Sequence, residues 1–183
     1  MASAFAHAFT AYTLKNLTTN PLLNNKFLFF VIISSIIPDL DVLGFRFDIA
    51  YGDLWGHRGM THSLLFAFIW SIFLWFIIWR SSDYRHQRFI SKTSITAITI
   101  LFLSTSSHGI LDAMTNGGLG VAFFSPFDTT RYFLPWQPIQ VSPIGVGAFF
   151  SSNGLRVLIS ELIWVGIPLL VLLTLLKLKN RIQ

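Results

Sequence analysis

The sequence contains no cysteine, which excludes disulfide bonds and every metal site built on thiolates. Any bound metal would therefore depend on imidazole and carboxylate groups. Charge is also scarce, because only 11% of the 183 residues are Asp, Glu, Lys or Arg, whereas about a quarter is usual in a soluble domain. A chain of this size exposes much of its surface, so the shortage of charge excludes an ordinary water-facing surface.

Hydrophobic residues, in contrast, make up 53% of the chain, and the mean hydropathy is +0.62. This composition indicates an integral membrane protein. The formal net charge of +5 is better explained by basic residues that flank membrane segments than by a nucleic-acid surface. No basic run is dense enough to bind nucleic acid, so we expect membrane lipids as partners and no nucleic acid.

Five apolar segments alternate with more polar connections and show no internal repeat. They predict an all-α fold, a polytopic membrane bundle of about four to five transmembrane or membrane-embedded helices, with residues 1–183 forming a single domain. Pro38 should end the second segment in an extended Pro-Asp-Leu-Asp turn, and the third should begin near Thr61. The five segments are Ser3–Leu17, Lys26–Ile37, Leu64–Trp79, Thr93–Met114 and Leu155–Leu176.

The basic residues also predict an orientation. They gather in the Arg80–Lys92 connection and in the tail after Leu176, which two spans separate, and Lys15 and Lys26 flank the first connection. Cytoplasmic loops carry the excess of Lys and Arg. We therefore expect a cytoplasmic C-terminus in a bacterial inner membrane.

The residue types that bind metals gather at the opposite ends of these segments. The Gly56–Ser63 stretch reads Gly-His-Arg-Gly-Met-Thr-His-Ser, and His108 and Asp112 are four residues apart, on one face of a helix. The orientation places all of them on the periplasmic side. The metal ligands that we predict are His7, Asp39, Asp41, His62, His108 and Asp112.

A site of nitrogen and oxygen ligands without sulfur suits zinc, with manganese or iron as alternatives, and one or two ions. Asp39 or Asp41 would act as a ligand or general base. Arg58 and His57 would stabilise an anionic group, with the ligand role of His57 left open, and Asn116 would line the substrate pocket.

Each residue also has a plainer interpretation. His7 alone is more often a hydrogen-bonded core histidine, Asp39 alone is a common capping residue, and Arg58 suits an interfacial anchor. Glu161 is expected to pair with an internal partner, and His86 lies among basic residues at the other end of the segments. The joint placement of the remaining residues is what favours a metal site.

These motifs resemble those of a known family. His7, Pro38-Asp39-Leu40-Asp41, the Gly56–Ser63 stretch and His108-Gly109-Ile110-Leu111-Asp112 look like the bacterial LexA-regulated, membrane-bound metal-dependent hydrolases. The likeness extends from His7 through Ser125-Pro126-Phe127. It implies an inner-membrane hydrolase.

A more distant similarity is to zinc-dependent phospholipase C and related single-strand nucleases. An early His, an Asp, a following His and a His-x-x-x-Asp helix occur there in the same order, which implies that Asp112 bridges two ions. No histidine follows His108 here, so the later His/His/Glu set of those enzymes is absent, and this departure implies fewer ions.

Three classes of function follow from the sequence. The first is a hydrolase in which metal-activated water attacks a lipid or lipid-linked phosphoester at the outer face of the membrane. The second is a non-enzymatic metal-binding membrane protein, a sensor or transporter, although the apolar Leu64–Trp79 segment offers no polar path for transport. The third is a structural protein whose histidines tie helix ends together.

Overall fold

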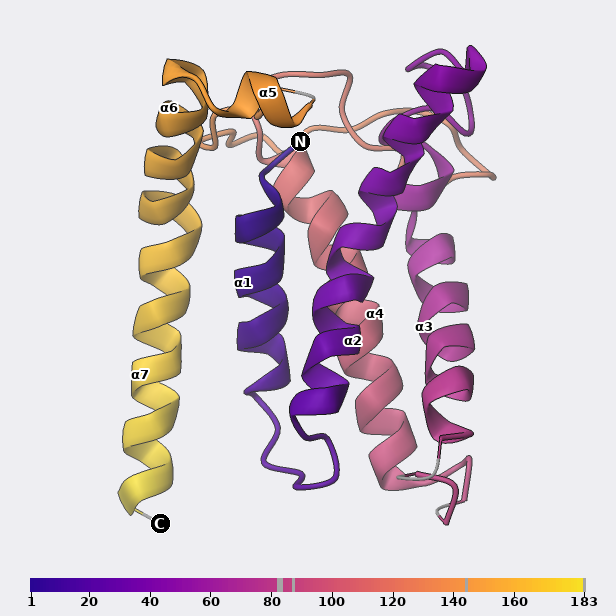
Figure 1. The fold of residues 1–183 in the computed structure, drawn as a ribbon, viewed down its shortest axis with the longest axis vertical. Helices are drawn as coiled ribbons and strands as arrows, with labels where there is room; N and C mark the ends of the chain where they lie inside the picture. The colour runs from indigo at the N-terminus through magenta and orange to yellow at the C-terminus, as the bar shows by residue number, and fades with distance from the viewer. Residues whose placement is uncertain (82–83, 87, 144, 183) are drawn as a thin grey trace.

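The computed structural model describes residues 1–81, 84–86, 88–143 and 145–182, and within these ranges the regular secondary structure is helical apart from two isolated β-bridges. The predicted all-α class is confirmed. Figure 1 shows the helices running side by side, with their connections at two ends. In chain order the elements are α1 (Ala4–Lys15), α2 (Asn25–Ile36), η1 (Ile37–Phe47), η2 (Met60–His62), α3 (Leu64–Trp79), α4 (Lys92–Ala113), α5 (Val146–Phe149), α6 (Ser152–Glu161), η3 (Leu162–Gly166) and α7 (Ile167–Ile182).

Four helices form the body of the bundle. Helix α4 packs against α1, α2 and α3, and the last helix of the chain lies at the side of α1 (Figure 1). The main apolar core lies between α2, α3 and α4, where Trp75 meets Phe27 edge to face and Leu101 is fully buried. Hydroxyl groups join the same helices, because Ser34 Oγ lies 2.7 Å from Thr105 Oγ1. Such small polar residues permit close helix packing within a membrane.

The Pro-Asp-Leu-Asp segment corrects one expectation. Instead of an extended turn, Ile37–Phe47 forms a 3₁₀ helix that continues α2. Pro38 stands at the start of this 3₁₀ helix, and because it has no N–H it leaves one carbonyl oxygen in the last turn of α2 without its helical donor. With about three residues per turn, Asp39 and Asp41 point in different directions, rather than to one side as an extended turn would require.

Helix α3 begins three residues later than the sequence predicted. Ser63 caps it by accepting a hydrogen bond from the Phe66 amide, and Met60–His62 forms the separate turn η2. Gly109 permits the close approach of η2 to α4, because a Cβ atom there would lie 3.1 Å from the His62 carbonyl oxygen.

The last helix is one continuous rod of three parts. A π-helical segment, Leu162–Gly166, joins α6 to α7 directly before Pro168. Proline cannot donate an amide hydrogen bond and its ring collides with the preceding turn, and a π-bulge is one way in which a helix accommodates this disturbance.

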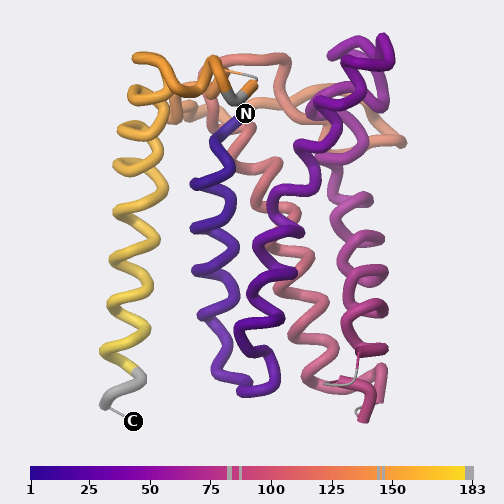
Figure 2. The backbone as a smooth tube through the Cα atoms, viewed as in Figure 1, coloured from indigo at the N-terminus to yellow at the C-terminus, as the bar shows by residue number. Residues whose placement is uncertain are grey.

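Three helical stretches are long and apolar enough to cross a membrane, namely Asn25–Phe47, Lys92–Ala113 and Ser152–Lys179, and Leu64–Trp79 is a shorter apolar helix. Helix α1 has 12 residues, which span about 18 Å and fall short of a bilayer core. Figure 2 shows that the N-terminus, η1, η2 and the long 114–151 connection lie at one end of the bundle. The C-terminus lies at the other.

Candidate metal centre

Four side chains converge at the end of the bundle that carries the N-terminus. Asp39 comes from η1, His62 from η2, and His108 and Asp112 from the last turns of α4. One ligand atom from each lies within 4.8 Å of the others, and all four residues are buried. The separation of four residues places His108 and Asp112 on the same face of α4, as the sequence predicted.

The orientation of His108 is fixed by a backbone group. Its Nδ1 lies 2.6 Å from the Ser35 carbonyl oxygen, which accepts only, so Nδ1 donates the proton. The neutral ring then carries its lone pair on Nε2, which lies 3.2 Å from Asp39 Oδ1. A backbone partner of this kind is typical of metal-binding histidines.

His62 is oriented by a carboxylate. Its Nδ1 lies 3.1 Å from Asp41 Oδ2, and its Nε2 faces Asp112 Oδ2 at 3.6 Å. Burial lowers the pKa of His62, but hydrogen bonds to the carboxylates of Asp112, Asp39 and Asp41 outweigh this effect and raise the pKa to about 10. The surroundings of His62 therefore strongly favour a positive charge.

The four facing atoms fit a metal ion because they are buried and none of them has a full hydrogen bond. They are Asp39 Oδ1, His62 Nε2, His108 Nε2 and Asp112 Oδ2, of which Asp112 Oδ2 is also ion-paired with Arg58 Nε. Buried polar atoms are normally hydrogen-bonded, and a cation between these two carboxylate oxygens and two ring nitrogens would satisfy all four once the proton favoured on His62 is displaced. Two imidazoles and two carboxylates form a donor set that suits zinc, manganese or iron.

Asp41 lies next to these four residues and is already engaged through both carboxylate oxygens. Oδ1 lies 2.7 Å from His57 Nδ1, and Oδ2 accepts from the Thr61 hydroxyl at 2.7 Å and the Arg58 amide at 3.1 Å. His57 keeps a buried Nε2 without a hydrogen-bond partner. The geometry therefore links Asp41 to the orientation of His57 and His62, and its predicted role as a ligand stays a prediction.

Arg58 is fully buried and directs its guanidinium at protein acceptors. Nε forms an ion pair with Asp112 Oδ2 at 3.0 Å, Nη1 donates to the Gly117 carbonyl at 2.9 Å, and Nη2 donates to Thr115 Oγ1 at 2.9 Å. Its backbone φ of 62° lies in the left-handed region, which is uncommon for a residue with a side chain. Gly118 is equally constrained, because a Cβ atom there would lie 2.8 Å from Arg58 Nη1.

His7 and Asn116 lie at the margins of the site. The His7 ring stacks on His108 with centroids 3.7 Å apart, and its Nε2 lies 3.7 Å from Asp112 Oδ1. His7 thus contacts the cluster from α1 without joining the group of four. Asn116 hydrogen bonds with Gln140 and the Val141 amide, and its role in substrate binding stays a prediction.

Two further expectations concern residues outside the group. Glu161 accepts hydrogen bonds from the amide and the hydroxyl of Ser3, which confirms an internal partner for this carboxylate. His86 stands in the chain between α3 and α4, and the end of α3 and the start of α4 lie at the end of the bundle away from the cluster (Figure 1).

Arg131 contributes a support that the sequence did not reveal. It donates to the His57 carbonyl at 2.8 Å and to the Tyr51 carbonyl at 2.9 Å, and it stacks over the Tyr51 ring. The Tyr51 ring in turn meets His57 edge to face, with centroids 5.1 Å apart. A single arginine in a long Gly- and Pro-rich connection is the only signal that the sequence offered.

Comparison with known proteins identifies relatives among inner membrane proteins. The profile of a family described as YdjM inner membrane protein matches residues 1–181. Inner membrane protein YbcI of Escherichia coli (strain K12) is 39% identical over 156 residues, which cover 85% of this chain and 86% of that protein. No solved structure matches significantly.

Proposed function

The chain belongs to the YdjM inner membrane protein family, and we propose that it is a metal-dependent hydrolase acting on a lipid or lipid-linked phosphoester. The observation that carries the proposal is the group of four buried donor atoms without a full hydrogen bond on Asp39, His62, His108 and Asp112. The sequence likeness to LexA-regulated membrane hydrolases and, more distantly, to zinc-dependent phospholipase C supports hydrolysis as the reaction.

The four donors would hold the ion, with zinc favoured and manganese or iron as alternatives. A divalent ion held there supplies a Lewis acid that polarises a phosphoryl oxygen and makes a water molecule more acidic. The residues of the chain supply the rest of the chemistry.

His57 is the proton acceptor in this proposal. Because Nδ1 of His57 is bonded to Asp41 at 2.7 Å, the lone pair of the neutral ring lies on Nε2. A carboxylate behind an imidazole fixes the tautomer and stabilises the protonated ring. The proton taken from water would stay on Nε2 and then pass to the leaving oxygen.

Arg58 acts as a positioning residue. Three of its nitrogens face protein acceptors, so its charge holds Asp112 and the 115–117 turn in place. This arrangement favours positioning over the direct contact with substrate that the sequence suggested.

The site lies at the end of the bundle away from the basic connections, and the positive-inside rule assigns that end to the periplasmic face. A substrate at this depth would be a lipid or a lipid-linked molecule. The choice of a phosphoester rests on the distant sequence likeness to zinc-dependent phospholipase C.

Removal of single donors tests the site. Asp112→Ala and His108→Ala should each abolish binding of the metal, as measured by elemental analysis of the purified protein. Hydrolysis of a panel of lipid phosphoesters in mixed micelles should be lost with it. His86→Ala removes the same kind of side chain at the other end of the bundle and should leave metal content and hydrolysis unchanged. Full metal content in both donor variants would contradict the site.

One observation favours a second candidate, a non-enzymatic metal-binding membrane protein. The group offers four protein donors, and structural zinc sites are four-coordinate whereas catalytic ones keep one position open. In that case the wild-type protein would contain metal and lose thermal stability on chelation, yet hydrolyse none of the phosphoesters.

A further inference from the structure

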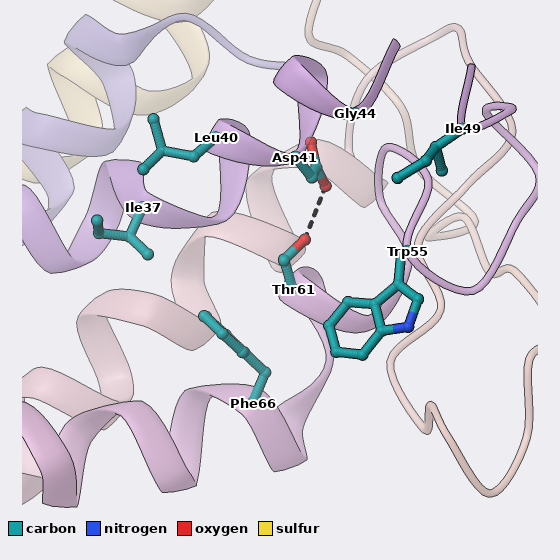
Figure 3. A pocket seen from close by; sticks show the side chains of 8 residues that line it. All are labelled: Ile37, Leu40, Asp41, Gly44, Ile49, Trp55, Thr61 and Phe66. Carbon is teal, nitrogen blue, oxygen red and sulfur yellow. Dashed lines mark hydrogen bonds between the residues drawn. The ribbon is translucent and has the colours of Figure 1, made fainter. Parts of the chain in front are cut away.

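A cleft of about 430 Å³ opens beside the metal centre, between η1 and the beginning of α3. Its volume lies within the roughly 300–1,000 Å³ of small-ligand sites. Figure 3 shows side chains from η1, the following loop, η2 and α3 around it. Its apolar walls are formed by Ile37, Leu40, Ile49, Trp55 and Phe66.

The only polar side chains in this lining are Asp41 and Thr61, which hydrogen bond to each other at 2.7 Å (Figure 3). The same Asp41 oxygen, Oδ2, also contacts His62 Nδ1 at 3.1 Å. The cleft therefore reaches Asp41, and only this side chain separates it from His62 of the group of four. Because the oxygens of Asp41 already accept hydrogen bonds, they favour no cationic or amide ligand in the cleft.

The cleft faces the apolar surroundings of the bundle. Ile37, Leu40 and Gly44 belong to the Asn25–Phe47 stretch that can cross a membrane. At the rim, Leu40 is 54% and Trp55 58% exposed. Trp55 lies in the connection that follows the Asn25–Phe47 stretch, and an exposed tryptophan beside a span is typical of the interface between lipid headgroups and acyl chains.

We infer that this cleft binds an acyl chain of a membrane lipid and is the lateral opening through which a lipid substrate reaches the metal centre. We choose an acyl chain as the occupant because the cleft has an apolar lining and is continuous with the lipid-facing surface of η1. The tail would lie along Ile37, Leu40 and Ile49, with the headgroup towards Asp41. The binding of the tail stands on the cleft itself, and only its link to catalysis rests on the proposed function.

The test uses the full chain in vesicles of phosphatidylethanolamine and phosphatidylglycerol that carry a photoreactive diazirine in one acyl chain. After illumination, peptide mass spectrometry locates the lipid adducts. The wild-type protein should carry adducts on Leu40, Ile49 and Trp55, at a higher yield than on Phe73 of α3 and Leu170 of α7, which are exposed but lie outside the cleft.

A variant that fills the cleft supplies the comparison. A Cβ atom on Gly44 would meet only the Ile49 side chain, at 3.4–3.8 Å, so Gly44→Leu adds bulk to the cleft without a backbone clash. We expect the cleft adducts to fall about tenfold, as for the loss of roughly two buried methylene groups, while the adducts on Phe73 and Leu170 persist. Gly52→Leu is the matched control, since a Cβ atom there has nothing within 4 Å.

Equal adduct yields on the cleft and on Phe73 and Leu170 in the wild type would overturn the inference, because they indicate ordinary contact with bulk lipid. Unchanged cleft adducts in Gly44→Leu would overturn it as well. Cleft adducts in a protein that hydrolyses no phosphoester would support the lipid site and contradict the hydrolase. Hydrolysis without cleft adducts would uphold the hydrolase and overturn the lipid site.

Discussion

At the scale of single residues, Asp41 is the side chain that connects most parts of the site. Its two oxygens face His57, His62, Thr61 and the Arg58 amide. A carboxylate can accept from all of them because both of its oxygens are acceptors. An asparagine amide would place an NH₂ group against one of these donors.

We therefore expect Asp41→Asn to lower metal affinity or hydrolysis by about 10–100-fold, the usual effect of removing a partner of a metal-binding histidine. Competition with a calibrated chelator measures the affinity. Asp128→Asn is the control, since Asp128 accepts hydrogen bonds from Thr130 and Tyr132 away from the cluster. A wild-type affinity and rate in Asp41→Asn would show that His62 and His57 need no carboxylate behind them.

His62 predicts how metal binding depends on pH. With a pKa raised to about 10, its imidazole is protonated at neutral pH in the metal-free protein, and binding must displace that proton. Apparent affinity should rise about tenfold per pH unit between pH 6 and 8, as measured by chelator competition. The stability of the metal-free fold should depend on pH in the opposite direction. The charged imidazole contributes stability that is lost as the pH rises through about 10. A pH-independent affinity would exclude His62 as a ligand.

At the scale of elements, the contact between α2 and α4 depends on a small residue. Ser34 is fully buried, lies 2.7 Å from Thr105 Oγ1 and accepts a hydrogen bond from Trp70 Nε1 of α3 at 3.0 Å. Three helices therefore meet at one hydroxyl group, on the residue directly before Ser35, whose carbonyl oxygen orients His108.

Ser34→Leu should destabilise the fold by about 1–3 kcal/mol through overpacking, and Ser34→Ala by only about 0.6 kcal/mol, as for an average hydrogen bond between membrane helices. Thermal unfolding in detergent measures both. Thr99→Leu, at an exposed position of α4, is the control and should leave the midpoint unchanged. Equal midpoints for Ser34→Leu and Thr99→Leu would show that α2 and α4 tolerate a larger separation.

Sequence patterns predicted the helices better than they predicted the side-chain directions within η1. The apolar run of α3 and the end of α4 were found within a few residues, because periodicity and capping are local properties. Pro38, in contrast, reads as a stop signal, and only packing shows that the chain continues as a 3₁₀ helix. That continuation separates Asp39, which faces His108, from Asp41, which faces His57.

At the scale of the whole molecule, the two ends of the bundle differ in charge. Lys15 ends α1, and Lys26 and Lys92 lie in the first turns of α2 and α4, all at the end away from the metal centre. The sequence alone predicted that the candidate ligand residues would share the other end, and Asp39, His62, His108 and Asp112 do lie together there. The buried role of Arg58 and the support from Arg131 depend on long-range contacts that no local pattern records.

This polarity predicts the orientation of the protein. A green fluorescent protein fused after Gln183 should be fluorescent, and alkaline phosphatase fused there should be inactive, because the positive-inside rule places the C-terminus in the cytoplasm. A phosphatase inserted after Asp128, in the long 114–151 connection, should be active. Active phosphatase after Gln183 would reverse the topology and move the metal centre to the cytoplasmic face.

The four candidate donors come from positions 39, 62, 108 and 112 of the chain, so they lie on three separate elements that are synthesised one after another. Two of them lie in the last turns of α4, and the site cannot assemble before that helix has entered the membrane. In the proposed hydrolase, metal can therefore bind only after that helix is in place. A chain that ends before α4 would have two of the four donors, Asp39 and His62, and should bind metal weakly.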